Sequence, residues 1–344
     1  MSKTIKQLGE HGLLKIFQQY CSPVVGDDAA PMGTTLPNHQ MVVTTDMLVD
    51  EVHFSDRTTS PEDVGWRAAA VNLSDLAAMG ARPWGLLMSV GLPSNTEINW
   101  IESVYRGFKE CLQTYGTELV GGDTVRSPIR TLSVTAFGQV PINRLIQRHT
   151  ATVGDALVIT GNHGLSKAGL ELLLHPEKYS SSKISQDLRQ ILQHHHQRPI
   201  PRFDALATLE NIHHTKLRES PKEDRILIDS WSETCKFVVS GMDSSDGLAD
   251  AIAQICRASQ VGIKINWSVL PIPDAIKSLA GDRALDWVLY GGEDFELVLC
   301  MPWQVATEFV QQLPTSTIIG EIIDADSEDN QINKLEMHST FQHF

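Results

Sequence analysis

The chain has 344 residues, of which 42% are hydrophobic, and its formal net charge is -14 at pH 7. This length exceeds what one ordinary hydrophobic core supports, so two domains are expected. The acidic charge argues against nucleic acid and against an anionic membrane surface as partners, because both attract basic proteins. Divalent cations would neutralise the excess of acid wherever several carboxylates gather at one site.

Five cysteines are scattered along the sequence, at Cys21, Cys111, Cys235, Cys256 and Cys300. Their odd number and wide spacing indicate neither a disulfide framework nor a zinc knuckle, and they favour a reducing compartment. The N-terminal residues contain no apolar signal core, and no apolar run approaches the roughly 20 residues that a membrane span requires. We therefore expect a cytoplasmic protein.

Two acid-bearing segments follow predicted regular elements in the first part of the chain. Apolar residues at helical spacing predict a helix over residues 5–20, which leads into the loop Gly26-Asp27-Asp28. The apolar run 41–43 then predicts a β-strand with Thr44-Thr45-Asp46 at its C-terminal end. Hard oxygen ligands at the end of a strand suit a metal cation, although a simple polar turn uses the same residue types.

A long helix is predicted next, because Ser60 and Pro61 provide an N-cap and a first helical position. Small apolar residues continue the pattern as far as Gly80, where the helix is expected to end. Asn72 and Asp75 are three residues apart and share one face. A carboxylate is poorly placed near the negative end of a helix dipole. Metal binding by Asp75 would explain this position, and an exposed side chain is the alternative.

Alternating strands and helices complete the first half. The sequence predicts a strand over 84–92, a helix over 98–115 and a strand over 131–140. Between the last two, a short strand at 118–120 is expected to end in the turn Gly121-Gly122-Asp123. This alternation fits an α/β or α+β domain.

The second half begins with a predicted strand over 156–160, a glycine-containing turn and a helix over 165–174. The turn, Gly161-Asn162-His163-Gly164, is not a phosphate-binding loop of a known pattern. Neither Gly-x-x-x-x-Gly-Lys-Ser/Thr nor Gly-x-Gly-x-x-Gly occurs in the sequence. Any bound nucleotide must therefore be held by metals and another scaffold.

Residues 176–235 are polar, and we expect them to be irregular, with His194-His195-His196 in a solvated loop. A strand at 237–239 then leads to Asp243-Ser244-Ser245-Asp246 at the start of a helix over 248–258. One helix cap needs only one acceptor, so the surplus acids and hydroxyls indicate ligand binding. The same combination of glycines and acids recurs in Gly291-Gly292-Glu293-Asp294, just before an apolar strand.

Further strands are expected over 261–266 and 317–323, with a helix over 304–313 between them. The chain closes with the aromatic sequence Phe341-Gln342-His343-Phe344, which is either frayed or docked on another part of the protein.

Taken together, six motifs in one order closely resemble the thiamine-monophosphate kinase family. They are Gly-Asp-Asp-Ala-Ala at 26–30, Thr-Thr-Asp-Met-Leu-Val at 44–49 with His-Phe at 53–54, Asn-Leu-Ser-Asp-Leu-Ala-Ala-Met-Gly-Ala-Arg-Pro at 72–83, Gly-Gly-Asp-Thr at 121–124, Asp-Ser-Ser-Asp-Gly-Leu at 243–248 and Gly-Gly-Glu-Asp-Phe-Glu-Leu at 291–297. That family belongs to an ATP-binding superfamily with aminoimidazole ribonucleotide synthetase, selenophosphate synthetase and a hydrogenase maturation protein.

The resemblance implies a two-domain fold like that of aminoimidazole ribonucleotide synthetase. Residues 1–150 would form an N-terminal α+β domain whose strands build a barrel with those of a second subunit. Residues 151–344 would form a C-terminal α/β domain with a polar insertion at about 176–235. ATP and several Mg²⁺ ions would lie in the cleft between the domains of a homodimer.

The resemblance also implies roles for individual residues, position by position. The magnesium ligands would be Asp28, Thr44, Thr45, Asp46, Asp75, Asp123, Asp243 and Asp246. Asp27 is adjacent to this set. The nucleotide would contact Tyr105, Gly122, Asp123, Arg148 and Ser245, and thiamine monophosphate would contact His53, Glu293 and Phe341. Two positions depart from the family pattern: Ser244 replaces an isoleucine, and Thr340 stands where a glycine usually precedes the aromatic residue.

The implied reaction is in-line attack by the phosphate of thiamine monophosphate on the γ-phosphorus of ATP, without a general base. Other members of the superfamily use different acceptors. A selenophosphate synthetase would need a reactive cysteine in a glycine-rich segment, but the residues around Cys21 are not rich in glycine. The hydrogenase maturation protein would need a cysteine at its C-terminus, whereas the last cysteine of this chain is Cys300. An aminoimidazole ribonucleotide synthetase-like enzyme, a two-metal phosphoesterase and a non-catalytic nucleotide sensor remain as alternatives.

Overall fold

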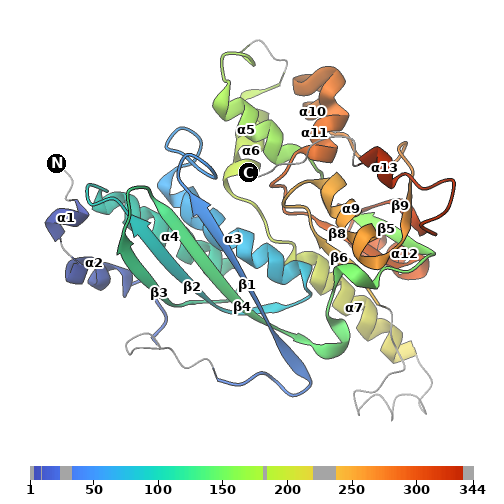
Figure 1. Cartoon of the computed structure of the whole chain (residues 1–344), viewed down its shortest axis with the longest axis horizontal. Coiled ribbons are helices and arrows are strands. Elements are labelled where there is room, and N and C mark those ends of the chain that lie inside the picture. Colours follow the sequence, from blue (N-terminus) through green and yellow to red (C-terminus); the bar gives the residue numbers. More distant parts are fainter. Residues whose placement is uncertain (1–3, 9, 24–32, 181–183, 220–237, 336–344) are drawn as a thin grey trace.

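The computed structural model of the chain describes residues 4–8, 10–23, 33–180, 184–219 and 238–335. These residues form two β-sheets, each with its own helices, and a long central helix, α3, lies between the two halves (Figure 1). The predicted ligands Asp27, Asp28 and Phe341 lie outside the described residues. None of the helices in the described ranges is long and apolar enough to cross a lipid bilayer.

The first half contains a four-stranded sheet with the strand order β1-β4-β2-β3, in which only β2 and β3 run parallel. Its elements are α1 (Ile5–Leu8), α2 (Glu10–Phe17), β1 (His39–Val49), α3 (Pro61–Ala78), β2 (Arg82–Leu92), α4 (Ile98–Thr114), β3 (Leu119–Arg126), β4 (Thr131–Pro141) and two 3₁₀ turns, η1 (Ile142–Arg144) and η2 (Arg148–Thr150).

Two of the predicted strand ends are wrong. Thr44-Thr45-Asp46 lies in the middle of β1, because the strand pairs with β4 from His39 to Val49. Gly121-Gly122-Asp123 likewise lies within β3, where it pairs with β2. In both places polar or glycine residues suggest the end of a strand, but pairing with a neighbouring strand extends the β-structure through them. Asp46 and Asp123 are therefore fixed on rigid strands rather than on turns.

Helix α3 begins and ends as the sequence predicts. The Ser60 hydroxyl accepts a hydrogen bond from the Asp63 amide at 3.2 Å, Pro61 occupies the first turn, and Gly80 has a positive φ of 73° just after the helix. Nearly every residue of α3 is buried, because one side packs on the four-stranded sheet and another side faces the second half of the chain. The small side chains of its alanine-rich centre permit this close packing.

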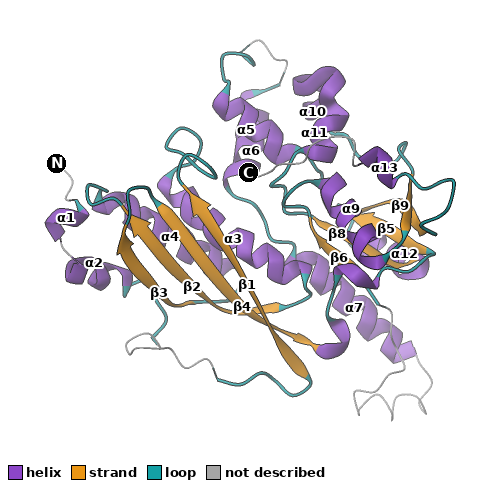
Figure 2. Ribbon diagram, viewed as in Figure 1, coloured by secondary structure: helices purple, strands orange, loops and turns teal. Residues whose placement is uncertain are grey.

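The four-stranded sheet has helices on one face only, as Figure 2 shows for the described residues. Alternate residues of β1 make this visible: Leu48 points toward the core, whereas Met41, Val43 and Met47 are 48%, 60% and 55% exposed. On β4 the inward side chains are buried in the same alternating manner. An apolar sheet face thus remains open in the single chain.

The second half contains a five-stranded antiparallel sheet with the strand order β6-β8-β5-β9-β7. Its elements are β5 (Asp155–Ile159), α5 (Leu165–Leu174), α6 (Gln186–Gln197), α7 (Phe203–Glu219), β6 (Ser240–Asp243), α9 (Leu248–Ser259), β7 (Gly262–Ile265), α10 (Asp274–Ala280), η3 (Gly281–Arg283), α11 (Ala284–Tyr290), β8 (Leu297–Pro302), α12 (Trp303–Gln312), β9 (Thr317–Ile323) and α13 (Ile332–Leu335).

Helices cover both faces of this sheet. Alternate residues of β8 enter two separate apolar cores: Leu297 and Leu299 pack toward α7 and α12, while Val298 and Cys300 pack toward α9 and α11. Burial on both faces explains why β5 and β8 are almost continuously apolar.

The expectation of an irregular segment over 176–235 is wrong for its described part, which contains α6 and α7. Leu188, Leu192 and His196 follow one another at four-residue spacing on α6, and Leu192 and His196 are almost fully buried. The His194-His195-His196 sequence therefore lies in the last turn of a helix, not in a solvated loop. Because the rest of α6 is polar, its short apolar stripe is hidden in the overall composition.

Candidate active site

A cavity of about 760 Å³ lies between the two halves of the chain. Strand β1 and helix α3 line it from the first half, and the start of α5 and the loops after β6 and α11 line it from the second. Its lining residues are Thr45, Asp46, Met47, Leu48, Val49, Val52, His53, Val71, Asp75, Ser166, Lys167, Leu170, Ser245, Asp246, Tyr290, Gly291, Gly292, Glu293 and Phe295.

Four predicted metal ligands gather at this cavity: Asp46 from β1, Asp75 from α3, and Asp243 and Asp246 from the end of β6 and the turn that follows. A direct hydrogen bond joins the two halves, since the Ser74 hydroxyl donates to Asp243 at 2.6 Å. Carboxylates that are distant in the sequence are thus brought together by the packing of α3 against β6.

Nearby hydroxyl and amide groups hold these carboxylates in place. The Thr44 hydroxyl donates to Asp75 at 2.5 Å, and the Ser245 hydroxyl donates to Asp243 at 3.2 Å. The backbone amide of Asp46 donates to the Asn72 side-chain oxygen at 3.1 Å, which ties β1 to α3. Thr45 also lines the cavity, but its hydroxyl donates to a backbone carbonyl of β4 at 2.9 Å.

The electrostatics of this cluster are unfavourable for three ionised carboxylates. Burial, reinforced by the charge of Asp46, raises the pKa of Asp75 to about 6, and burial with the charge of Asp75 raises the pKa of Asp243 to about 6. The pKa of Asp46 is raised by burial and by Asp243 and Asp246. The guanidinium of Arg148 opposes the shifts of Asp75 and Asp243. Additional positive charge would relieve the remaining repulsion.

The oxygen-only donor set fits Mg²⁺, which prefers hard oxygen ligands. Among the described residues, no three His, Cys, Asp or Glu side chains lie close enough together to form one coordination sphere. Magnesium in proteins keeps several waters and binds through one or two carboxylates together with substrate phosphates. The carboxylate oxygens at this end of the cavity are donors of that kind.

Two predicted thiamine monophosphate contacts, His53 and Glu293, line the same cavity. The ring nitrogen Nδ1 of His53 accepts a hydrogen bond from the Val49 amide at 3.1 Å. Glu293 has a positive φ of 69°, and its amide donates to the Ser245 carbonyl at 2.7 Å. Although burial opposes it, the positive charge of Arg67 lowers the pKa of Glu293. Glu293 is therefore held as a carboxylate at the cavity wall.

The diglycine sequence before Glu293 has a steric reason. A Cβ atom on Gly291 would lie 2.3 Å from the Trp287 carbonyl oxygen, and one on Gly292 would lie 2.8 Å from the Ser245 carbonyl oxygen. Only glycine permits this close approach of the loop to α11 and to the turn after β6.

Three predicted nucleotide contacts do not reach the cavity within one chain. The side chain of Tyr105 is 3% exposed, and its ring stacks on Phe17 in the core of the first half, with 4.1 Å between ring centroids. Its contact with a nucleotide stays a prediction. Gly122 and Asp123 lie on β3, at the opposite edge of the sheet from β1. Three inter-strand spacings separate these two strands, which is about 14 Å.

Two other predicted nucleotide contacts lie at the carboxylate cluster. Arg148 in η2 donates to Gln254 at 2.7 Å and acts electrostatically on Asp75 and Asp243, while Ser245 lines the cavity. Sequence reasoning missed other residues of the site, notably Arg67, Ser74 and His196. Ser74 lies within a motif that was identified, but no local pattern marks the other two.

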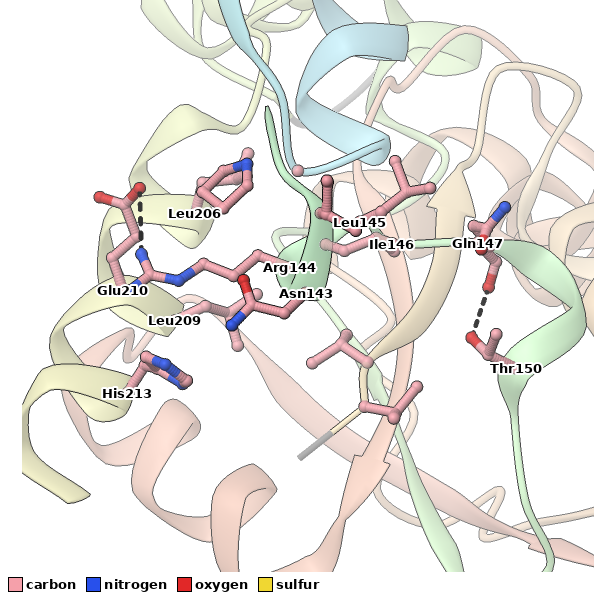
Figure 3. A pocket seen from close by; sticks show the side chains of 15 residues that line it. Asn143, Arg144, Leu145, Ile146, Gln147, Thr150, Leu206, Leu209, Glu210 and His213 are labelled. Atoms are coloured by element: carbon pink, nitrogen blue, oxygen red, sulfur yellow. Dashed lines mark hydrogen bonds and ion pairs between the residues drawn. The ribbon is translucent and has the colours of Figure 1, made fainter. Parts of the chain in front are cut away.

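A second, smaller cavity of about 260 Å³ lies between η1 and α7 (Figure 3). Figure 3 shows Arg144 facing Glu210 across it, with 3.9 Å between Nη1 and Oε1. It contains none of the residues that the sequence predicted for ligand binding. We therefore place the active site in the larger cavity.

Residues 26–140 match the family model of the AIR synthase related protein, N-terminal domain. Together with the two-sheet fold and the acidic cavity between its halves, this match defines a protein of the AIR synthase related class.

Whole-chain similarities are more specific. The chain is 43% identical to the thiamine-monophosphate kinase of Synechococcus elongatus over 348 residues, which covers 99% of this chain and 98% of that protein. Its fold is similar to the crystal structure of thiamine-monophosphate kinase from Stenotrophomonas maltophilia K279a, with a TM-score of 0.72, 32% identity and coverage of 91% of this chain and 92% of the other. It is also similar to AaThiL complexed with AMPPCP and TMP, with a TM-score of 0.71, 29% identity and full coverage of both chains. The chain belongs to the thiamine-monophosphate kinase family, as its six motifs predicted.

Proposed function

We propose that the protein transfers the γ-phosphoryl group of ATP to thiamine monophosphate and so produces thiamine diphosphate and ADP. The observation that carries this proposal is a cluster of carboxylates from three separate elements: Asp46 and Asp75 line the cavity that Glu293 also lines, and Asp243 lies close to both. The 43% identity to a thiamine-monophosphate kinase over 99% of the chain supports the choice of substrate. So does the similarity to AaThiL, whose structure contains the ATP analogue AMPPCP together with TMP.

The reaction needs positioning and charge neutralisation more than acid–base chemistry. A terminal oxygen of the thiamine monophosphate phosphate forms a bond to the γ-phosphorus, and the bond from that phosphorus to the β–γ bridging oxygen breaks to release ADP. The attacking phosphate is already ionised at neutral pH, so no general base is required. The protein must instead hold two anions in line against their mutual repulsion.

The carboxylate cluster provides the means. Asp46, Asp75, Asp243 and Asp246 would hold Mg²⁺, with Thr44 oriented against Asp75. When bound, Mg²⁺ would neutralise the phosphate oxygens of both substrates. Arg148 and Ser245 would bind the nucleotide at this end of the cavity. His53 and Glu293 would bind the thiamine heterocycles, whose thiazolium ring is cationic.

The open face of the four-stranded sheet supports the further proposal that the protein is a homodimer. Exposed apolar side chains on this face include Val43 on β1 and Val125 on β3, which are 60% and 54% exposed. A second sheet packed on this face would complete a barrel between subunits. Gly122 and Asp123 lie too far from the cavity of their own chain, so in this dimer they would serve the nucleotide site of the partner.

The presence of one β-sheet in each half of the chain supports a division into two domains. The N-terminal domain would contain residues 1–150, and the C-terminal domain would contain residues 151–344. Cys21, Cys111, Cys256 and Cys300 are free thiols. Their reduced state supports a cytoplasmic location.

The decisive test is ADP formation by the purified protein with Mg²⁺ and ATP, in the presence and absence of thiamine monophosphate. We expect ADP formation to depend on thiamine monophosphate and to match the thiamine diphosphate produced. Release of inorganic phosphate without an acceptor would instead indicate a phosphoesterase. Binding of ATP without turnover would indicate a nucleotide sensor, and ADP formation only with another acceptor would indicate a different synthetase of the class.

A further inference from the structure

Arg67 is a fully buried arginine on α3, with a side-chain exposure of 0%. Its guanidinium connects two distant parts of the second half of the chain. It donates one hydrogen bond to the His196 carbonyl oxygen at the end of α6, at 2.5 Å, and another to the Glu293 carboxylate on the cavity wall. Because burying an arginine is costly unless it is paired, such a position needs a specific reason.

The Glu293 carboxylate is held from more than one side. One of its oxygens pairs with Arg67, and the other lies 3.6 Å from Nδ1 of His196. That ring nitrogen also lies 3.1 Å from the hydroxyl of Ser166, another cavity residue. Arg67 of α3 thus pairs directly with the carboxylate, and His196 of α6, itself in contact with Ser166 of α5, lies beside it. The carboxylate belongs to a loop with unusual backbone geometry, since Glu293 and Phe295 both have positive φ angles.

Helix α3 relates this pair to the carboxylate cluster. Arg67, Val71 and Asp75 follow one another at four-residue spacing, so they form one stripe along the helix. Val71 and Asp75 line the cavity, and the ends of the stripe are about 12 Å apart along the helix axis. Thiamine monophosphate is itself extended, with an anionic phosphate at one end and an aminopyrimidine at the other. The rigid helix α3 therefore sets the distance between the end of the cavity that would bind the phosphate and the end that would bind the rings.

We propose that Arg67 is a positioning residue that sets the Glu293 carboxylate for recognition of the thiamine heterocycles, and that His196 of α6 completes this clamp. This inference rests on the proposed function. It also gives a role to α6, which lies in the segment 176–235 and had no functional explanation in the sequence. Lysine cannot replace Arg67 fully, because the planar guanidinium reaches Glu293 and the His196 carbonyl at the same time, whereas an ammonium is a single point charge.

The test is a double-mutant cycle with Arg67→Met, Glu293→Gln and the double variant, with kinetics measured for both substrates. We expect each single variant to raise the KM for thiamine monophosphate by about 10-fold to 100-fold, because a carboxylate displaced by an ångström no longer meets its target. The KM for ATP should change by less than about 2-fold. The double variant should be no worse than either single variant, since both remove the same contact.

Two controls separate positioning from general stability. Arg82→Met removes a surface arginine that is 75% exposed and pairs with Glu210, and it should leave both KM values unchanged. In a calorimetric titration without ATP, where no turnover occurs, Arg67→Met should bind thiamine monophosphate with lower affinity than the wild type. If Arg67→Met fails to fold, Arg67→Lys keeps the charge in place and should show the same selective rise in KM to a smaller extent.

An unchanged KM for thiamine monophosphate in the folded Arg67 variants, or strictly additive effects in the double variant, would overturn the positioning role. These outcomes differ from failure of the proposed function, in which the wild-type protein itself would form no ADP in response to thiamine monophosphate. In that case the melting temperatures of the same four proteins would still report whether Arg67 and Glu293 are coupled.

Discussion

Replacing Asp243 by asparagine should stabilise the metal-free protein while it destroys activity. Asp243 is 3% exposed, and burial together with the charge of Asp75 raises its pKa from 3.8 to about 6. A carboxyl group whose pKa is raised on folding holds its proton more tightly in the folded state. Its contribution therefore becomes unfavourable as the pH rises from about 4 through about 6, and the full cost is present at pH 7.5.

The size of this effect follows from the shift of about two pKa units, which corresponds to about 3 kcal/mol of unfolding free energy. Asparagine carries no charge, so this cost disappears. It has one side-chain oxygen instead of two, so either Ser74 or Ser245 loses its acceptor, which costs about 1 kcal/mol. We expect Asp243→Asn to be more stable than the wild type by about 2 kcal/mol in EDTA at pH 7.5.

Urea unfolding at pH 7.5 in EDTA measures the stability change, and ADP formation with Mg²⁺, ATP and thiamine monophosphate measures the activity. The kcat of Asp243→Asn should fall by at least about 100-fold, because a carboxylate that would hold Mg²⁺ beside the substrate phosphates is lost. Asp282→Asn, at an exposed position in η3, is the control and should change neither quantity. A variant of Asp243 that is markedly less stable than the wild type, or that keeps wild-type turnover, would refute the reasoning.

Three further predictions concern other parts of the molecule. His163 is fully buried, and burial lowers its pKa to about 3, so the stability that it provides is complete above pH 6.5 and declines as the pH falls. Between pH 7.5 and pH 5 the wild type should lose about 2 kcal/mol of unfolding free energy that His163→Gln does not lose. An equal loss in both proteins on urea unfolding would contradict this. Gly292→Ala should reduce kcat/KM by at least about 10-fold, because its Cβ meets the Ser245 carbonyl at 2.8 Å. Gly116→Ala is the control: its Cβ meets nothing within 4 Å, and although its positive φ of 67° costs about 1 kcal/mol of stability, it should keep its activity. Equal activities of the two variants would argue against the loop contact. Val43→Lys on the open sheet face should give a monomer in light scattering, whereas the control Leu285→Lys on α11 should leave the dimer intact. A dimeric Val43→Lys protein would place the interface elsewhere.

Elements with strong local signals could be predicted from the sequence. The start of α3 follows from Ser60 and Pro61, and α5 and β9 have the predicted bounds, 165–174 and 317–323. The errors occurred where tertiary contacts override local composition. Polar residues within β1 suggested its end, because a sequence does not reveal that pairing with β4 continues through Thr44, Thr45 and Asp46.

The site was predictable to the extent that its residues lie in short motifs. Asp46, Asp75, Asp243 and Asp246 belong to such motifs, and the structure brings them together. Arg67 was not predictable, because its partner Glu293 is 226 residues away and only the packing of α3 against the second half places them in contact. Tyr105 was assigned by resemblance alone, and its ring packs in the core beside Phe17, so its nucleotide contact stays a prediction.

The central claim is that carboxylates from β1, α3 and the end of β6 act together through magnesium on one nucleotide. Calorimetric titration with AMPPCP, in Mg²⁺ and in EDTA, tests it most directly on the wild type and on Asp46→Asn, Asp75→Asn and Asp243→Asn. The account predicts that each substitution weakens AMPPCP binding at least about 10-fold in Mg²⁺ and has little effect in EDTA. Wild-type affinity in Mg²⁺ for all three variants would contradict it.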